Sequence, residues 1–325
     1  MKVFITGATG FIGSEVARKL RQRGDGVVAL VRSPEKAAAL DQLGCDLVPG
    51  DLGDDDAIRA GMSDCQAVIH AAAMYEVGIK ADRREPMYDA NVRGTERIMQ
   101  AARDVGTPRV IYVSTCGVFG NTQGEVVDET YHRTQPGFGS YYEETKYQAH
   151  QLVKRFIAEG LPAIIVMPGF TYGAGDPSAV GQVVEQFIAK KLPALPVPTM
   201  GGTFVHRDDV ADGILLALDK GLPGESYVLG GEIATNRDFA DKLAAGLGRK
   251  PPRNLPTGVI KAIAPLGPLI GPAMGFPPNF NEIVNSDGFT YFGSHAKATR
   301  ELGYSPRPLD QGLKDMLAAR EKTRS

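Results

Sequence analysis

The sequence predicts an α/β fold in which a doubly wound parallel sheet is joined to a smaller C-terminal α/β domain. Two observations predict it. Short apolar runs alternate with helical patterns through the first half of the chain, and most of these runs are continuously apolar rather than alternating. Continuously apolar strands are typical of parallel sheets buried on both faces, and helices are the usual connections between parallel strands.

The expected elements of the first half follow one another in a regular order. Strands are expected at Lys2–Thr6, Gly26–Val31, Asp46–Pro49, Ala67–Ala71, Arg109–Ser114 and Ala163–Met167. Helical patterns lie between them: one ends near Arg23, and later ones cover Pro34–Leu43, Pro86–Val105 and Tyr141–Glu159. Pro34 suits a first helical turn, where a missing N–H costs nothing. In such a sheet, ligands bind beyond the carboxyl ends of the strands.

After Pro168 the pattern changes. Residues 170–204 are rich in Gly and Pro, whereas Arg207–Asp219 reads as a helix that could return to the first domain. We therefore predict a first domain of residues 1–169 to which residues 205–222 return. Residues 170–204 and 223–325 are predicted to form the second domain, with the active site in the cleft between the two.

Composition excludes several classes of function. The chain has 325 residues, is 43% hydrophobic and 23% charged, and carries a net charge of −2. No basic stripe points to a nucleic acid, and the apolar segment Val259–Met274 is too short and too often interrupted by proline to cross a bilayer. The three cysteines have neither metal-site spacing nor an even number, so we expect no metal, no disulfide framework and a cytoplasmic location.

A glycine-rich segment lies between the first expected strand and the first expected helix. It reads Gly7-Ala8-Thr9-Gly10-Phe11-Ile12-Gly13. Gly7 suits a tight turn, Gly10 allows the backbone to approach a pyrophosphate, and Gly13 allows close packing of helix on strand. The helix that follows offers unpaired N–H groups and a positive dipole end to the phosphates. Its position between a strand and a helix makes this a strong indication of a dinucleotide site.

Tyr142 and Lys146 are four residues apart at the start of an expected helix, so both project from one face. A free tyrosine is a poor acid or base at neutral pH, but a nearby lysine cation favours the phenolate and lowers its pKa. We therefore expect Lys146 to lower the pKa of Tyr142 and to make it a general acid/base for an alcohol or ketone oxygen. The preceding strand ends in Ser114 and Thr115, whose hydroxyls are placed to bond that oxygen.

These features together resemble the extended short-chain dehydrogenase/reductase family over nearly the whole chain. The matching pieces, in order, are Thr6–Gly13, Asp51-Leu52, His70-Ala71-Ala72, Asn91–Thr95, Val113–Gly120, Tyr142-x-x-x-Lys146, Pro168-Gly169, Tyr172-Gly173, Phe204–Ala211 and Lys297–Tyr304. The resemblance implies a Rossmann fold and a catalytic triad of Thr115, Tyr142 and Lys146. Most relatives have serine where this chain has Thr115, so the added methyl narrows the site.

The resemblance also implies contacts to the cofactor. Asp51 and Leu52 would border the adenine, Ala71 and Ala72 would line the cofactor path, and Pro168 and Gly169 would meet the nicotinamide. The loop residues Gly7, Thr9, Gly10, Phe11, Ile12 and Gly13 would hold the phosphates, with Tyr142 and Lys146 beside the nicotinamide ribose. Asn91 corresponds to an asparagine that distorts a helix or relays a proton in relatives, and a surface amide is the equally weighted alternative.

The end of the second strand indicates which cofactor is used. Members that prefer NAD have an acid there for the ribose 2′-hydroxyl. This chain has Val31, followed by Arg32 and Ser33, and a guanidinium can bind a 2′-phosphate. Residues 31–34 also resemble dihydroflavonol-reductase-like members. We therefore predict NADP(H) rather than NAD(H), with adenine stacking or a solvent-facing position as the alternative for Arg32.

Three functions remain open. The first is an NADPH-dependent reductase acting on a ketone or aldehyde, with the apolar segment 259–276 as a lid over a hydrophobic substrate. The second is a nucleotide-sugar epimerase or dehydratase that keeps NAD bound. Arg32 argues against it, and so do Met167 and Cys116, because that class carries other residues at these two positions. The third is a non-catalytic NADP(H) sensor, and the intact triad argues against it.

Other side chains near the expected site have plainer interpretations. His70 is expected to pack or to bond the backbone, and Cys116 to be a small packing residue. Aromatic residues could line a substrate pocket or belong to the core: Tyr75, Tyr141, Phe170 and Tyr172. The resemblance also implies a homodimer, because in many relatives the helices corresponding to Pro86–Val105 and Tyr141–Glu159 form a four-helix dimer contact, which could be lined by Ala101, Ala102, Ala149 and Leu152.

Overall fold

The structure is a computed structural model that describes residues 1–255, 258, 282 and 286–322. A seven-stranded sheet forms its centre, with strand order β3-β2-β1-β4-β5-β6-β9 and every neighbouring pair parallel. The strands are β1 (Lys2–Thr6), β2 (Gly26–Val31), β3 (Asp46–Pro49), β4 (Ala67–His70), β5 (Val110–Val113), β6 (Ala163–Pro168) and β9 (Ser226–Leu229). The order reverses between β1 and β4, which opens a crevice at their carboxyl ends. The predicted doubly wound fold is confirmed.

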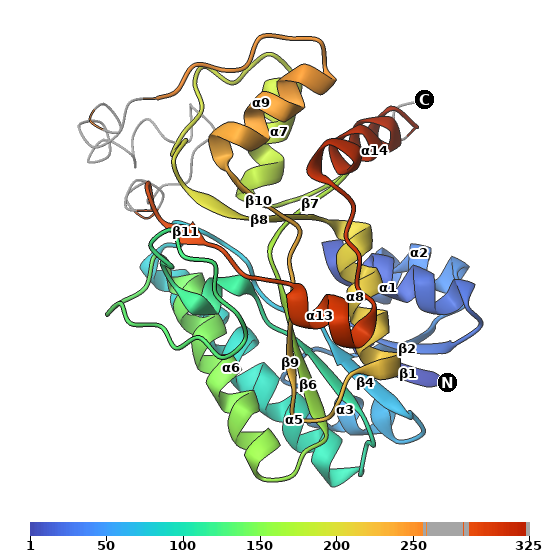
Figure 1. The fold of residues 1–325 in the computed structure, drawn as a ribbon. Helices are drawn as coiled ribbons and strands as arrows, with labels where there is room; N and C mark the ends of the chain where they lie inside the picture. Colours follow the sequence, from blue (N-terminus) through green and yellow to red (C-terminus); the bar gives the residue numbers. More distant parts are fainter. Residues whose placement is uncertain (256–257, 259–281, 283–285, 323–325) are drawn as a thin grey trace.

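Helices cover both faces of this sheet (Figure 1). One face carries α1 (Phe11–Gln22), α2 (Ala38–Gln42), α8 (Arg207–Lys220) and α13 (Ala296–Leu302); the other carries α3 (Asp55–Met62), α5 (Gly94–Asp104) and α6 (Tyr141–Ala158). Each strand therefore sends its side chains into two apolar cores. Burial on both faces is the reason why the strands read as continuous apolar runs.

Residues of the second half divide between two sheets. Helix α8 packs on α1 of the first unit. Residues 226–229, which the prediction assigned to the smaller domain, form β9 beside β6, and α13 packs on α8. The smaller sheet contains β7 (Phe170–Tyr172), β8 (Gly201–His206), β10 (Glu232–Thr235) and β11 (Thr290–Tyr291). It packs with α7 (Ala179–Ile188), α9 (Asn236–Gly246) and α14 (Leu309–Lys322).

Two expected helices differ in detail. Pro34–Leu43 is divided into a 3-10 turn at Pro34–Lys36 and the short α2, because the N–H of Ala37 bonds the Pro34 carbonyl and closes the first turn early. The helix expected at Pro86 begins at Arg84 as α4 (Arg84–Tyr88), since proline is tolerated within a first turn. A π-helical turn at Asp89–Arg93 then connects it to α5.

The side chains expected to line a dimer contact are not at the surface. Ala101, Ala102, Ala149 and Leu152 are at most 5% exposed because α5 and α6 turn them towards the sheet and towards each other. That part of the expectation is wrong.

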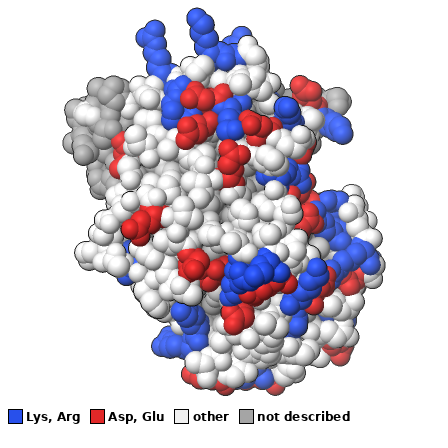
Figure 2. Space-filling model, in the orientation of Figure 1, with Lys and Arg blue, Asp and Glu red and all other residues white. Residues whose placement is uncertain are grey.

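Charge and hydropathy of the surface agree with the composition. Lysine and arginine are interspersed with aspartate and glutamate on the face drawn in Figure 2. Among the described residues, no helix has the length and apolar character needed to cross a membrane. The segment 259–276, predicted as a lid, lies outside the described residues.

Candidate active site

The carboxyl ends of the central strands bring most of the expected site residues to one edge of the sheet. Gly7 follows β1, Ala71 and Ala72 follow β4, Thr115 lies two residues after β5, and Pro168 and Gly169 end or follow β6. A parallel sheet places all these ends together, so segments up to 160 residues apart in the sequence share one crevice. The predicted site residues named here therefore follow strand ends at one edge of the sheet.

The glycine loop has the backbone shape that a dinucleotide site needs. Gly7 has a φ of +76°, and a Cβ there would lie 2.6 Å from the backbone nitrogen of Ala72. A Cβ on Gly13 would lie 2.1 Å from the Gly7 carbonyl oxygen. Glycine is therefore required at both positions, since backbone atoms cannot move aside cheaply. The loop therefore packs closely against the backbone that follows β4 and against the first turn of α1.

The start of α1 is free to bind an anion. Its N-cap is Gly10, which offers no side-chain hydrogen bond to the first turn, and both Gly10 and Thr9 are exposed. Phe11 and Ile12 are partly exposed in the same turn. Unpaired N–H groups and the positive end of the helix dipole thus face the crevice. This chain's own residues fit the diphosphate of a dinucleotide.

A buried hydrogen-bond chain holds β1, β4 and α5 together below this loop. Nδ1 of His70 lies 2.7 Å from Oγ1 of Thr6, and Nε2 lies 3.0 Å from Oγ1 of Thr95. The Thr95 hydroxyl donates to the Asn91 carbonyl at 2.7 Å, so it can only accept from His70. His70 therefore carries its proton on Nε2, and Thr6 donates to Nδ1. Thr6 also accepts from the N–H of Ala72 at 3.4 Å.

This arrangement gives His70 a positioning role that the sequence did not suggest. The ring is fully buried, and burial together with the nearby Lys146 charge lowers its pKa to about 3. One expected alternative was that His70 bonds the backbone. In the structure it bonds the side-chain hydroxyls of Thr6 and Thr95 instead. The neutral ring orients the Ala72 backbone at the crevice through Thr6 and does not exchange protons at neutral pH.

Lys146 connects α6 to the end of β5. Its Nζ donates to the Val113 carbonyl at 2.9 Å and lies 4.8 Å from the centre of the Tyr112 ring. The side chain is 3% exposed, and this burial lowers the pKa of the ammonium to about 7. At neutral pH the ammonium and the amine are therefore both populated.

The two hydroxyls after β5 point to different partners. Ser114 is buried, and its Oγ lies 2.9 Å from Nδ1 of His150 on α6. Thr115 is partly exposed, and its Oγ1 accepts from the N–H of Gly117 at 3.1 Å, so its own O–H is still available to donate. The expectation that both hydroxyls can reach a substrate is wrong for Ser114, which is buried against His150, whereas Thr115 is partly exposed.

Tyr142 is protonated at neutral pH. Burial raises the pKa of its phenol well above the ordinary value, and the neighbouring Tyr75 raises it further. The expectation that Lys146 lowers this pKa is wrong here, because desolvation dominates and the ammonium is bonded to Val113. The phenol therefore keeps its proton at neutral pH.

Asn91 lies in the π-helical turn and is 2% exposed, so it is not a surface amide. Its Oδ1 accepts from the N–H of Met74 at 2.7 Å, and its Nδ2 donates to the Met74 carbonyl and to Oγ1 of Thr145, each at 3.0 Å. The helix distortion turns this amide inward. It ties the coil after β4 to α6 next to Lys146.

The residues expected around the adenosine end have varied surroundings. Arg32 is exposed and Ser33 is partly exposed just after β2. Asp51 is exposed, but its Oδ1 accepts from the N–H of Gly53 at 2.8 Å. Leu52 packs against Gly94 at the start of α5.

The other aromatic and thiol candidates are now placed. Tyr172 is buried in the core against Phe239, and the ring of Tyr141 lies against the guanidinium of Arg84. Phe170 packs between Phe204 and Tyr291. Cys116 is buried, and burial raises the pKa of its thiol to about 12, as suits a packing residue.

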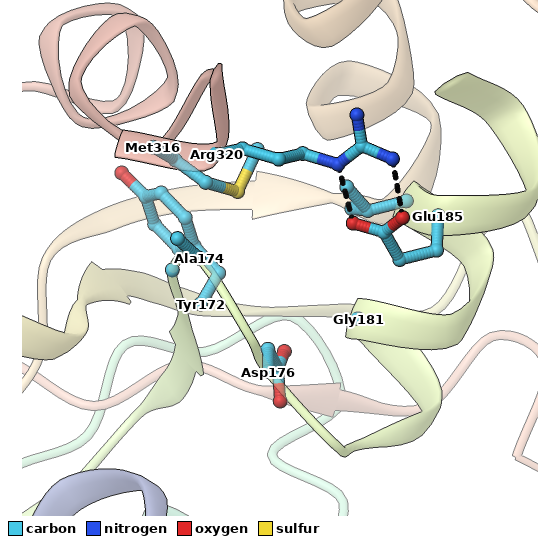
Figure 3. Close-up of a pocket in the computed structure, with 9 residues that line it drawn as sticks. Tyr172, Ala174, Asp176, Gly181, Glu185, Met316 and Arg320 are labelled. Atoms are coloured by element: carbon cyan, nitrogen blue, oxygen red, sulfur yellow. Dashed lines mark hydrogen bonds and ion pairs between the residues drawn. The ribbon is translucent and has the colours of Figure 1, made fainter. Parts of the chain in front are cut away.

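Two hollows in the structure lie away from the triad. One lies between β7, α7 and α14, where Arg320 pairs with Glu185 and Asp176 precedes α7 (Figure 3). The other lies behind Ser114 and is lined by His150, Glu129 and Lys154 among others. Neither is lined by the predicted catalytic residues Thr115, Tyr142 and Lys146.

Comparisons with known proteins agree with this geometry. The profile of the NAD dependent epimerase/dehydratase family matches residues 3–230. A 4-hydroxy-2-methyl-3-oxo-4-farnesyl-3,4-dihydroquinoline-1-oxide ketoreductase from Stigmatella aurantiaca is 32% identical, with 98% of this chain and 96% of that protein covered. Sterol demethylase protein B from Methylococcus capsulatus is 34% identical, with 98% of each covered.

Solved structures are also similar. The crystal structure of gox2253 has a TM-score of 0.83 and 34% identity, covering 99% of this chain and 98% of that one. A dTDP-glucose 4,6-dehydratase from Streptomyces venezuelae, crystallised with NAD, has a TM-score of 0.81 at 24% identity and covers 100% of this chain and 98% of its own, which shows a shared fold. With its glycine loop and its Thr–Tyr–Lys set at one sheet edge, the chain belongs to the NAD-dependent epimerase/dehydratase family, the nicotinamide-dinucleotide-binding enzymes of the extended short-chain dehydrogenase/reductase class.

Proposed function

We propose that this chain is an NADPH-dependent oxidoreductase that reduces a ketone or aldehyde to an alcohol. The observation that carries the proposal is the bond from Lys146 to the Val113 carbonyl, which fixes α6, with Tyr142 in its first turn, to the end of β5, two residues before Thr115. Carbonyl reduction consumes one proton at the oxygen, and a neutral phenol is the form that can donate it. A bound reduced nicotinamide supplies the hydride.

In this mechanism each residue of the chain has one task. The free O–H of Thr115 donates a hydrogen bond to the carbonyl oxygen and orients it. Tyr142 then donates its proton to that oxygen as negative charge develops there. Because burial lowers the pKa of Lys146 to about 7, part of the Lys146 population carries a proton at neutral pH and can return a proton to Tyr142 after the transfer.

NADP(H) is the proposed cofactor. Arg32 supports this choice because it is exposed just after β2, next to Ser33, where a guanidinium can bind a 2′-phosphate. Arg32→Asp should replace that attraction by repulsion and lower the NADPH preference by about tenfold or more, or about 1.4 kcal/mol. Fluorescence titration with NADPH and NADH measures this, and unchanged NADPH affinity would contradict the role of Arg32.

The proposed substrate is an apolar cyclic ketone. Two relatives over the full length support this: the ketoreductase of a farnesylated quinoline oxide, and a sterol demethylase protein. Aldehydes of similar size are the second group to test. A carbonyl compound without charged groups is also consistent with the neutral site residues Thr115 and Tyr142.

The decisive experiment follows NADPH oxidation by the purified protein with a panel of cyclic ketones and aldehydes. We expect turnover that falls at least about 100-fold in Tyr142→Phe, which keeps the ring and removes the acid. Turnover that is unchanged in Tyr142→Phe would refute the mechanism. Turnover lost in that variant would exclude the non-catalytic sensor.

The alternative is a nucleotide-sugar epimerase or dehydratase, and the nucleotide that co-purifies distinguishes it. Tightly held NAD, with no reduction of the ketone panel, would favour sugar nucleotides as substrates. An empty or NADPH-exchanging protein supports the reductase.

Assembly, location and domain roles stay predictions. A homodimer through α5 and α6 would have to use outward-facing side chains such as Glu96, Arg103 and Arg155. Sedimentation that shows a monomer at micromolar concentration would refute it. The cytosol is proposed because the three cysteines are free and buried. The smaller sheet with α7, α9 and α14 is proposed to bind the substrate.

A further inference from the structure

Tyr75 lies in the coil after β4, at the carboxyl edge of the central sheet, in contact with the catalytic tyrosine. The edge of one ring faces the other: the centroids of Tyr75 and Tyr142 are 4.8 Å apart and their planes meet at 76°. Tyr75 nevertheless leaves 46% of its surface exposed. Folding stability gains little from a large ring left in water. An exposed ring beside the reacting hydroxyl is what a pocket wall requires.

The coil that carries Tyr75 is held in place. Asn91 binds both backbone groups of Met74, the preceding residue, at 2.7 and 3.0 Å. A second anchor follows, where the N–H of Gly78 donates to Glu282 at 2.7 Å. Since Asn91 also donates to Thr145 on α6, the coil and the catalytic helix are fixed to one another. The contact between the two tyrosine rings is therefore a built feature of the fold.

The hydroxyl end of Tyr75 reaches the smaller unit. It lies against the backbone N–H of Ala179 in the first turn of α7, near the carboxylate of Asp176. Asp176 is fixed by the N–H and the hydroxyl of Ser178, both at 2.8 Å. Figure 3 shows Asp176 in the segment that leads into α7. The ring of Tyr75 thus extends from the catalytic helix to the unit proposed to bind the substrate.

We propose that Tyr75 is a specificity-determining residue: its ring forms the wall of the substrate pocket beside the Tyr142 hydroxyl and limits the size of the ketone that can reach it. The inference rests on the proposed function, since it names what selects substrates at that same site. It assigns the selection to Tyr75 because, of the four aromatic candidates in the sequence, Tyr75 alone has its ring on Tyr142 among the described contacts.

The first test compares a small ketone, cyclohexanone, with a tetracyclic one, 5α-androstan-3-one. Removing the ring in Tyr75→Ala should raise the ratio of kcat/KM for the large ketone over the small one by about tenfold or more, as expected when a pocket wall is removed. Tyr75→Phe keeps the ring and should retain the wild-type ratio within about threefold. Tyr141→Ala, the same truncation against Arg84, is the matched control.

The second test does not depend on turnover. The chain contains no tryptophan, so Tyr75→Trp introduces a single tryptophan at the proposed wall, whose emission can be excited selectively. Its emission should change and saturate as each ketone is added to the NADP⁺-loaded protein, whereas Tyr141→Trp should not respond. Circular dichroism confirms that each variant is folded.

The outcomes separate the two proposals. A shifted ratio in Tyr75→Ala, or a fluorescence response in Tyr75→Trp that Tyr141→Trp does not show, supports the pocket wall. An unchanged ratio together with an unresponsive Tyr75→Trp variant overturns it while the reductase stands. If wild type reduces no ketone or aldehyde of the panel, the proposed function fails, and the fluorescence of Tyr75→Trp alone then decides: a saturating response supports the wall and its absence overturns it.

Discussion

Replacing Lys146 by methionine tests the claim that the folded protein buries a charge. Methionine keeps the length of the side chain and removes the ammonium, which in the wild type is 3% exposed. Burial lowers the pKa of Lys146 from 10.5 to about 7. Each pKa unit corresponds to about 1.4 kcal/mol. The lowered pKa therefore means that the free energy of unfolding is about 5 kcal/mol smaller when Lys146 is charged than it would be without the shift.

The sign of the pH dependence follows from the same two values. Between pH 7 and 10.5 the unfolded chain holds a proton on Lys146 that the folded chain has released, so raising the pH stabilises the wild type. Below pH 7 both states are protonated and the full penalty applies. Lys146→Met escapes this penalty, at the expense of the hydrogen bond to Val113, which contributes about 1 kcal/mol.

Urea unfolding of both proteins at pH 6, 7, 8 and 9 measures the effect. The free energy of unfolding of Lys146→Met, relative to wild type, should be highest at pH 6 and should fall by about 2 to 3 kcal/mol between pH 7 and 9. Lys154→Met is the control, because it removes an exposed lysine from the same helix. A Lys146→Met difference that stays constant with pH would refute the reasoning.

Three further predictions concern the loop, the hydroxyls and the amide clamp. Gly13→Ala should weaken NADPH binding at least about tenfold by fluorescence titration, because its Cβ would meet the Gly7 carbonyl at 2.1 Å, whereas Gly26→Ala, with neighbours no closer than 3.4 Å, should not. Thr115→Val should lower kcat at least about 100-fold and Ser114→Ala about threefold or less, and equal losses would show that the two hydroxyls were misassigned. Asn91→Ala should cost about 2 to 3 kcal/mol of unfolding free energy, measured with urea, since it leaves the buried backbone groups of Met74 without partners.

Much of the fold could be predicted from the sequence because its signals are local. The bounds predicted for β1, β2 and β3 agree with the structure to the residue, since each strand is a continuous apolar run between glycines or polar residues. The glycine loop could be interpreted in the same way: a strand, three spaced glycines and a helix are adjacent in the sequence.

Other elements gave weaker or misleading local signals. The Gly- and Pro-rich character of residues 170–204 did not indicate α7, which is stabilised by packing in the core of the smaller sheet. Likewise, the position of β9 in the chain does not show that it pairs with β6, because the paired residues are about 60 positions apart in the sequence.

The sequence by itself determined which residue types are available at the active site and which strand ends carry them. Only the tertiary structure decided which partners those side chains have: Thr115 accepts from Gly117, Ser114 contacts His150, and Lys146 donates to Val113. It also decided that the ring of Tyr75 lies against Tyr142. The physical reason is that hydrogen-bond partners and desolvation depend on contacts between distant segments, whereas propensity and spacing describe only near neighbours.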